Sequence, residues 1–371
     1  MALRVSAAER GTTARPGRRI RPVRTAGPAA CGRPRRYRRC TVHRLPILDF
    51  SEPSACLPAR ASGRAHPITW MSVTPMSPLP LPVPGRFLRV GGVPLHVLTE
   101  GRGPVCVLSG GLGMAWYDWD AVAALLAPYR TVVRFDRPGL GLSAPASGPP
   151  TLAAEADRIA HLLDALGHFG PATVVGHSLA GFHAEAFARL HPARCAGLVL
   201  ADGSIEDAPR PRLPRAVRTA VAGSVAAAVS AAGLPRALGP ATRRLIDRAT
   251  TVGSHPPHPW EHTYRTSRVL RACVLENATY GYQAAELAAL RPARPLPAAP
   301  VTVLAAYDGS ETPRQLRWLE RQRGLAAELG GRFALAAPAG HLLMADAPAS
   351  VARAVLDLSG TGRDAAVPER P

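Results

Sequence analysis

The chain has 371 residues, 47% of them hydrophobic and 19% charged, which is enough for one large domain with a packed core and extra segments. All 45 basic residues are arginine, and fifteen of them lie in residues 1–70 with only three acidic residues, so the net charge of +19 belongs mainly to the N-terminal segment. No stretch reaches the roughly eighteen apolar residues of a transmembrane helix, and the six cysteines and the histidines show no zinc-ligand spacing. We therefore expect no transmembrane segment, no metal or other cofactor, and a reduced, cytoplasmic compartment.

The N-terminal segment, residues 1–80, is rich in Arg, Pro, Ser and Gly and lacks both helical and strand periodicity. This composition predicts disorder, as it does for the tail at 361–371. Met71 and Met76 are alternative start sites to Met1. A basic segment can bind nucleic acid or anionic lipid, but no nucleic-acid-binding module accompanies it, and we expect no nucleic-acid partner.

Regular patterning begins at residue 87. A hairpin is predicted around Gly91-Gly92, and short apolar runs then alternate with segments of helical spacing. Continuous apolar runs of this kind are typical of buried parallel strands. The predicted strands are 104–108, 131–135, 172–175 and 196–200, and the predicted helices are 118–126, 152–166 and one from 178 toward 190.

Residues 203–295 interrupt the alternation with helical, Ala- and Arg-rich sequence. The alternation resumes with a strand at 301–306, a helix at 313–329, a strand at 332–335 and a helix at 349–358. Strands that alternate with helices predict an α/β fold with a mainly parallel sheet flanked by helices. We expect its core to comprise 85–202 and 296–360, with 203–295 as a helical insertion.

The strongest chemical signal is Gly176-His177-Ser178-Leu179-Ala180-Gly181, directly after a predicted strand. A serine on a tight strand-to-helix turn needs small neighbours two residues before and after it, which Gly176 and Ala180 supply. The helix N-terminus places positive partial charge near Ser178. The N–H of Leu179 can then stabilise an oxyanion.

Two further turns follow predicted strands. Residues 108–113, Leu-Ser-Gly-Gly-Leu-Gly, form a glycine-rich turn in which Gly111 is the candidate for a second oxyanion donor. In residues 135–143 we interpret Asp136 and Arg137 as residues that stabilise the turn and not as catalytic groups.

These blocks, in this order, make residues 87–358 similar to the α/β-hydrolase superfamily, in its branch of cap-bearing esterases and lipases. The chain departs from the usual motifs at Ser109, where many relatives have histidine, and at Ala180, which replaces a glycine. The resemblance implies an acid and then a histidine after the nucleophile. Asp308 follows the strand at 301–306, and His341 lies in a loop after the last strand. We favour Asp308 as the acid, with Asp202 as the alternative.

The resemblance also implies that residues 203–295 form a cap over the active site, in which Trp260, Tyr264, Tyr280 and Tyr282 are candidates to line a substrate pocket. The resulting hypothesis is a serine hydrolase that cleaves a small hydrophobic ester through Ser178, His341 and Asp308. Amide or peptide hydrolysis, perhydrolysis, C–C bond hydrolysis and a catalytically silent binding role on the same fold remain open alternatives.

Overall fold

An eight-stranded sheet runs through the part of the chain that the computed structural model describes, residues 83–253 and 255–358. Its strand order is β1-β2-β4-β3-β5-β6-β7-β8. The pairs β1–β2 and β2–β4 are antiparallel, and all other neighbours are parallel. The strands are β1 (Arg86–Val90), β2 (Val93–Glu100), β3 (Val105–Ser109), β4 (Thr131–Phe135), β5 (Ala172–His177), β6 (Cys195–Ala201), β7 (Val301–Ala306) and β8 (Arg332–Ala336).

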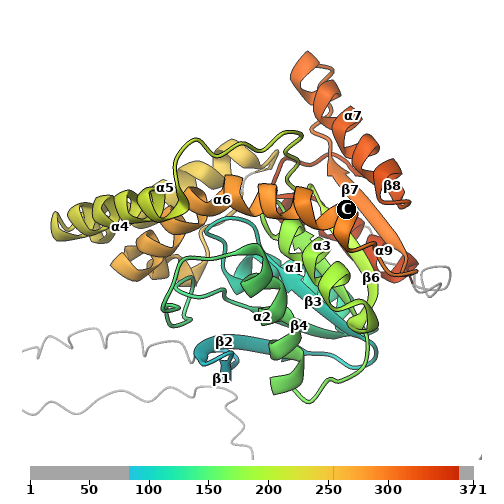
Figure 1. The fold of residues 1–371 in the computed structure, drawn as a ribbon, viewed down its shortest axis with the longest axis horizontal. Helices are drawn as coiled ribbons and strands as arrows, with labels where there is room; N and C mark the ends of the chain where they lie inside the picture. The colour runs from blue at the N-terminus through green and yellow to red at the C-terminus, as the bar shows by residue number, and fades with distance from the viewer. Residues whose placement is uncertain (1–82, 254, 359–371) are drawn as a thin grey trace, which may run out of the picture. The chain divides into compact units, whose positions relative to one another are not determined.

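Helices cover both faces of this sheet (Figure 1). One core packs α1 (Asp120–Leu126), the short α8 (Leu343–Asp346) and α9 (Pro348–Asp357) against the strands. The other packs α2 (Leu152–Ala165), α3 (Ala180–Leu190) and α7 (Pro313–Glu328) against the opposite face. Two short 3-10 helices, η1 (Trp116–Trp119) and η2 (Pro192–Arg194), complete the core. The predicted fold is therefore confirmed.

Consecutive side chains of the central strands divide between the two cores. In β5, for example, Val174 belongs to the core under α2 and α3, and Val175 belongs to the core under α1 and α9. A strand buried on both faces must be apolar at nearly every position, which is why the sequence shows continuous apolar runs here.

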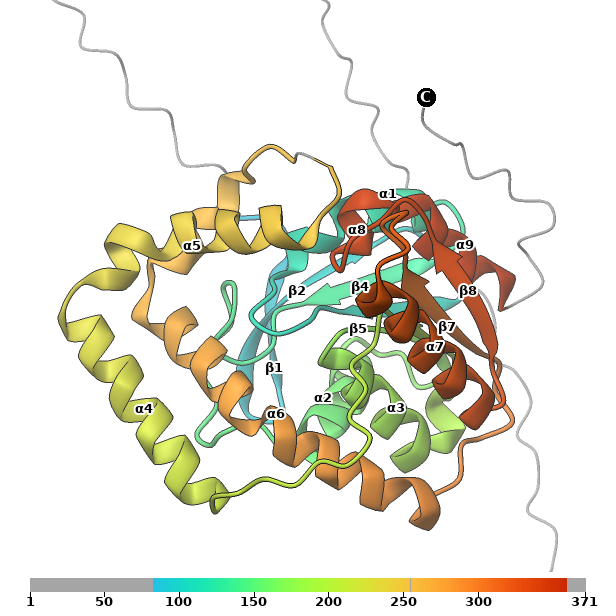
Figure 2. The ribbon, with the colours of Figure 1, turned by 90° about the horizontal axis from the view of Figure 1, so that it is seen from above.

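The predicted helical insertion lies between β6 and β7. It comprises α4 (Arg215–Ala231), α5 (Leu234–Thr250), the 3-10 helix η3 (Pro259–Arg265) and the long α6 (Ser267–Ala293). Figure 2 shows α6 running past α2 and α3, with α4 on the outer side of the insertion. Two helices of the insertion therefore stand away from the sheet, and one lies against the core.

The predicted segments 1–80 and 361–371 and the alternative start sites Met71 and Met76 lie outside the described residues. Within the described part, no single helix has the length and hydropathy to cross a membrane, although α4 and α5 together pass that test as a pair bent by 108°. Cys106, Cys195 and Cys273 are free thiols. Among the same described residues, no cluster of His, Cys, Asp and Glu side chains is arranged to hold a metal ion.

Candidate active site

Ser178 occupies the turn between β5 and α3 in a left-handed backbone conformation, with φ of 50°. Non-glycine residues rarely adopt this conformation, and the surrounding turn must hold it in place. Two hydrogen bonds to the Ser178 carbonyl do so, from the N–H of Gly181 at 2.9 Å and from that of Ser204 at 3.1 Å. A Cβ on Gly176 would collide with the carbonyl oxygen of Ala180, so the glycine two residues before Ser178 is required sterically.

His341 lies in the loop between β8 and α8, as predicted, with its Nε2 3.0 Å from the Ser178 Oγ. Neighbouring backbone bonds anchor this loop. The N–H of Ala339 donates to the Tyr307 carbonyl at 2.8 Å, and that of Leu342 donates to the Thr250 carbonyl at 3.0 Å. The side chain of His341 is 39% exposed, so solvent and substrate can reach the Ser178–His341 pair.

The second ring nitrogen of His341 faces Asp202. Its Nδ1 lies 2.6 Å from Asp202 Oδ2, and the carboxylate is buried. The other oxygen, Oδ1, accepts hydrogen bonds from the N–H of Ala306 at 3.0 Å and from Trp318 Nε1 at 2.8 Å. Asp202 directly follows β6, the parallel neighbour of β5. It therefore lies at the same edge of the sheet as Ser178, which directly follows β5.

The preference for Asp308 as the partner of His341 is therefore wrong, and the alternative, Asp202, occupies that position. Asp308 follows β7, one strand farther from Ser178, and is exposed on the surface. Its carboxylate accepts a hydrogen bond from the Ser310 N–H at 2.8 Å, which lowers the pKa of Asp308. The Asp202 carboxylate already occupies the end of β7 through its bond to Ala306.

Both predicted oxyanion donors lie beside Ser178. Leu179 follows it and caps the N-terminus of α3, where backbone N–H groups lack partners inside the helix. A Cβ added to Gly111 would lie 3.0 Å from the Ser178 Cβ, so the glycine allows close approach. The Gly111 N–H points at the Met114 sulfur, 3.0 Å away, and a thioether is a weak acceptor that a substrate oxygen can displace.

A buried ion pair holds the turn that carries Gly111. Arg137 donates to the carbonyls of Gly110 and Gly111, the latter at 2.6 Å, and its Nε donates to Glu276 on α6 at 2.7 Å. Glu276 in turn accepts from the Gly113 N–H at 2.9 Å. Burial alone would lower the pKa of Arg137, but the carboxylate of Glu276 more than offsets this effect and raises it. Arg137 is thus a permanent cation that orients the turn.

His177 supports the backbone of His341. Its Nε2 lies 2.8 Å from the His341 carbonyl and its Nδ1 lies 3.1 Å from the Met114 sulfur. Burial lowers the pKa of His177 well below 6.5, so the ring is neutral. Because a carbonyl only accepts, the proton of the neutral ring resides on Nε2.

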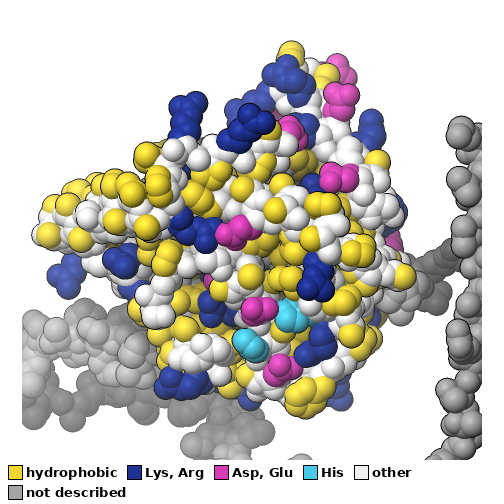
Figure 3. Space-filling view, viewed as in Figure 1, with side chains coloured by type: hydrophobic (Ala, Val, Ile, Leu, Met, Phe, Trp, Pro, Cys, Tyr) yellow, Lys and Arg dark blue, Asp and Glu magenta, His cyan; other side chains and the backbone are white. Residues whose placement is uncertain are grey.

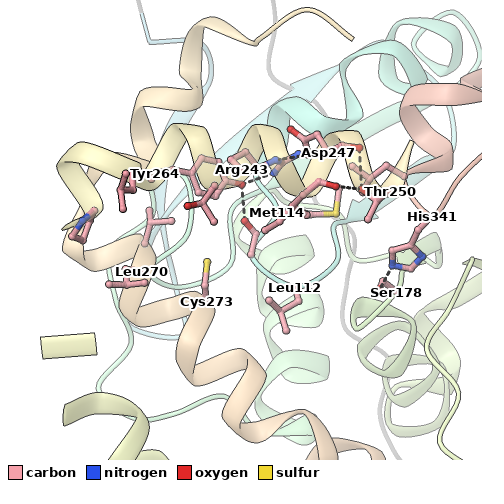
Figure 4. A pocket seen from close by; sticks show the side chains of 18 of the residues that line it. Leu112, Met114, Ser178, Arg243, Asp247, Thr250, Tyr264, Leu270, Cys273 and His341 are labelled. Atoms are coloured by element: carbon pink, nitrogen blue, oxygen red, sulfur yellow. Dashed lines mark hydrogen bonds and ion pairs between the residues drawn. The ribbon is translucent and has the colours of Figure 1, made fainter. Parts of the chain in front are cut away.

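A cavity of about 510 Å³ opens next to Ser178 and His341 (Figure 4). The cavity runs between the core and the insertion, with Ser178 and His341 near one end and Tyr264 toward the other. Its walls are mostly apolar. The apolar lining includes Leu112, Met114, Leu234, Leu238, Ile246, Val269 and Leu270.

One charged cluster borders this cavity. Arg243, on α5, is buried and bonds to Asp118 at 2.5 Å, to Asp247 at 2.7 Å and to the Tyr264 hydroxyl at 2.5 Å. Burial would lower the pKa of Arg243, but the Asp118 carboxylate and the neighbouring hydroxyls of Tyr264 and Tyr117 together raise this pKa well above its usual range. The guanidinium therefore stays charged, and two carboxylates neutralise it.

Of the four aromatic residues predicted to line a pocket, Tyr264 does so. Trp260 instead packs against Trp116, and Tyr280 packs against Phe182 in the core. Tyr282 is half-buried against the start of α4, where its hydroxyl donates to the Leu213 carbonyl and Arg215 lies over its ring. Aromatic type alone could not separate these roles, because α6 has both a core-facing and an outward-facing side.

Sequence reasoning missed the contributions of Met114, Glu276 and Arg243 to this site. Glu276 left a detectable signal, because it lies within a run of buried positions at helical spacing on α6, namely Val269, Ala272, Glu276, Thr279 and Gln283. An acid on an otherwise buried helix stripe requires a buried cationic partner. Arg243 gave no such signal within an Arg-rich chain.

Comparison with known proteins agrees with this fold. The profile of the alpha/beta hydrolase family matches residues 106–354. The chain is 36% identical over 110 residues to polyketide synthase ThaQ of Burkholderia thailandensis, which is 30% of this chain and 5% of that protein. It is 31% identical over 121 residues to epoxide hydrolase B of Mycobacterium tuberculosis, 31% of this chain and 34% of that one.

A solved structure of a thermophilic esterase from Thermogutta terrifontis shares the fold. It superposes with a TM-score of 0.51 at 24% identity, covering 74% of this chain and 98% of that one. The curated relatives, by contrast, are matched over less than half of their own length.

Proposed function

The chain belongs to the alpha/beta hydrolase family, and we propose that it is a serine hydrolase that cleaves the carboxylic ester of a small, hydrophobic, uncharged substrate. The observation that carries this proposal is the continuous hydrogen-bonded chain from Ser178 through His341 to Asp202, which borders an apolar cavity. Such a chain is the arrangement that activates a serine as a nucleophile.

In the proposed reaction, His341 Nε2 accepts the Ser178 proton while Oγ attacks the ester carbonyl carbon. Asp202 keeps the proton of the neutral imidazole on Nδ1 and stabilises the imidazolium that forms. The N–H groups of Gly111 and Leu179 stabilise the tetrahedral oxyanion, and each such donor contributes about 2.7–4 kcal/mol. His341 then protonates the leaving alcohol. Water activated by the same histidine releases the acid from the acyl-enzyme.

The preference for an uncharged substrate rests on the Arg243 cluster. An unpaired arginine in the wall would recruit a carboxylate or phosphate, but Arg243 already bonds to Asp118 and Asp247. A substrate anion would add a third negative charge around one guanidinium. The apolar walls meanwhile favour hydrocarbon, and the volume of about 510 Å³ is suited to an ester of moderate size.

Amide, C–C bond and peroxide chemistry use the same three side chains, and no contact among the described residues of the cavity favours one of them over ester hydrolysis. Part of the chain is similar to epoxide hydrolase B. The turn after β5, however, carries a serine and not a carboxylate, so epoxide hydrolysis is less compatible with this site.

The test is hydrolysis of p-nitrophenyl esters of increasing acyl length by the wild type and by Ser178→Ala. We expect wild-type activity with a medium-chain optimum, no activity in Ser178→Ala, and poor turnover of a matched ester that carries a distal carboxylate. Labelling of Ser178 by a fluorophosphonate reports the activated serine without relying on the choice of ester. Full activity in Ser178→Ala would refute the proposal.

A further inference from the structure

Helix α4 presents an apolar face to the outside of the molecule. Val217, Val221 and Val225 follow one another at intervals of four residues, so they share a face of the helix, and they are 47%, 58% and 52% exposed. In α4, whose residues are all described, Ala226 is the buried residue. Figure 3 shows hydrophobic side chains gathered over this arm of the molecule.

The charged side chains exposed around this face are all positive. Residues 219–235 contain no charged side chain, so the outer end of α4 and the start of α5 are uncharged and mainly apolar. Exposed arginines border this stretch on each side, with Arg218 before it and Arg236 after it, and Arg248 is exposed in the last turn of α5. Among the described residues of α4 and α5, Asp247 is the one acidic residue, and it is paired with Arg243. The exposed charges at the rim of the apolar face are therefore cationic.

Helix α5 adds further exposed apolar side chains to the arm. Leu234, Leu238 and Ile246 are among the exposed hydrophobic side chains of the described residues, and they also line the cavity beside Ser178. The arm therefore carries exposed apolar side chains both on the outer face of α4 and at the cavity.

We propose that the α4–α5 arm docks on the surface of an anionic phospholipid membrane. An amphipathic helix with an apolar face and a cationic rim lies in the interface, with its apolar side chains among the acyl chains and its arginines at the phosphates. The inference does not depend on the proposed ester hydrolysis, because it rests on the outer face of the arm and not on Ser178.

The shape of the arm and its charge favour the surface of a bilayer as the occupant. Helices α4 and α5 each have 17 residues and meet at 108°, and neither is long and apolar enough to cross a membrane alone. The bent arm can lie flat on the surface. The cationic rim would repel a second copy of the same arm, whereas anionic headgroups complement it.

The experiment measures co-sedimentation of the full-length chain with phosphatidylcholine vesicles that contain phosphatidylglycerol. The comparison is between the wild type and the triple variant Val217→Ser, Val221→Ser, Val225→Ser. None of the three valines lines the cavity, so activity on a water-soluble ester and the melting temperature serve as controls for folding. The variant keeps every arginine, so any binding by the Arg-rich N-terminal segment is equal in both proteins.

We expect the triple variant to lose binding by at least about tenfold, since the three exposed valines would make much of the apolar contact with the acyl chains on docking. A matched variant, Phe169→Ser with Leu316→Ser and Leu335→Ser, removes three exposed hydrophobic side chains elsewhere and is expected to bind as the wild type does.

A tryptophan introduced by Val221→Trp is expected to shift its fluorescence to the blue on vesicle addition, and Ser178→Ala is expected to bind like the wild type. Equal binding by the wild type and the triple variant overturns the proposal. It is also overturned if the wild type is a dimer that the triple variant dissociates, because the arm would then be covered by a second copy.

Discussion

Replacing Asp202 by asparagine isolates the role of its negative charge. Asp202 Oδ1 accepts hydrogen bonds from the Ala306 N–H and from Trp318 Nε1. Both partners are donors, so the amide introduced by Asp202→Asn must place its oxygen toward them. Its NH₂ group then faces His341 Nδ1, where the carboxylate Oδ2 now lies at 2.6 Å.

This orientation reverses the imidazole tautomer. A donor opposite Nδ1 requires that nitrogen to accept, so the proton of the neutral ring moves to Nε2 and points at the Ser178 Oγ. In that state His341 cannot take the serine proton. We expect kcat/KM to fall by about 10³–10⁴, equivalent to about 4–5.5 kcal/mol of the barrier.

The assay is hydrolysis of the best p-nitrophenyl ester by the wild type, Asp202→Asn and Asp308→Asn, with thermal melts to confirm folding. Asp308 is exposed and contacts Ser310, so its asparagine variant is expected to stay within about twofold of the wild type. Loss of activity in Asp308→Asn, with Asp202→Asn active, would refute the reasoning and restore the assignment that the sequence order suggests.

Glu276→Gln leaves the buried Arg137 cation without its counter-charge. Thermal or urea unfolding is expected to show that the variant is less stable by about 3–5 kcal/mol. An unchanged melting temperature would mean that the pair is not buried in solution. Gly111→Ala is expected to abolish ester hydrolysis, because the added Cβ would lie 2.7 Å from His177 Nδ1 and 3.0 Å from the Ser178 Cβ. The control variant Gly148→Ala adds its Cβ in open space and is expected to keep wild-type activity. Burial lowers the pKa of His183 from 6.5 to about 3, so below pH 6.5 the unfolded chain binds a proton that the folded chain does not, and the free energy of unfolding falls as the pH drops. From pH 7 to pH 5 this loss amounts to roughly 2 kcal/mol, and urea unfolding at both pH values is expected to show a smaller loss in His183→Gln; equal losses would contradict the assignment.

The features predicted correctly from the sequence are those that adjacent residues determine. Buried strands appear as apolar runs, and the turn at Ser178 requires small residues at 176 and 180. The insertion is evident because the alternation of strands and helices stops at 203. His341 follows from its position after the last strand. Each of these signals is contained in a few consecutive residues or in the order of segments.

The features that were missed depend on which strands and helices become neighbours. Asp202 and Asp308 both follow strands, and only the sheet order places β6 next to β5 and orients the Asp202 carboxylate toward His341. Arg137 and Glu276 are 139 residues apart, so their pairing depends on how α6 packs against the turn that carries Arg137. The lining of the cavity depends on how α5 and α6 rotate about their axes, which sequence patterning of an Ala-rich insertion does not determine.

The contacts of the insertion divide it into a fixed part and a freer part. Helix α6 belongs with the core, because Glu276 neutralises buried Arg137 and Gln283 bonds to buried His183 at 2.7 Å. Lifting α6 would leave Arg137 unpaired in the interior and would release the turn that carries the Gly111 donor.

Helix α4 is held less firmly than α6. Its Arg215 pairs with Glu286 of α6 at a partly exposed position, where an ion pair contributes little, and Ala226 is its buried residue. Any opening of the cavity is therefore expected to move α4 and the adjoining start of α5, the apolar arm that we assign to the lipid surface, while α6 keeps the oxyanion turn in place.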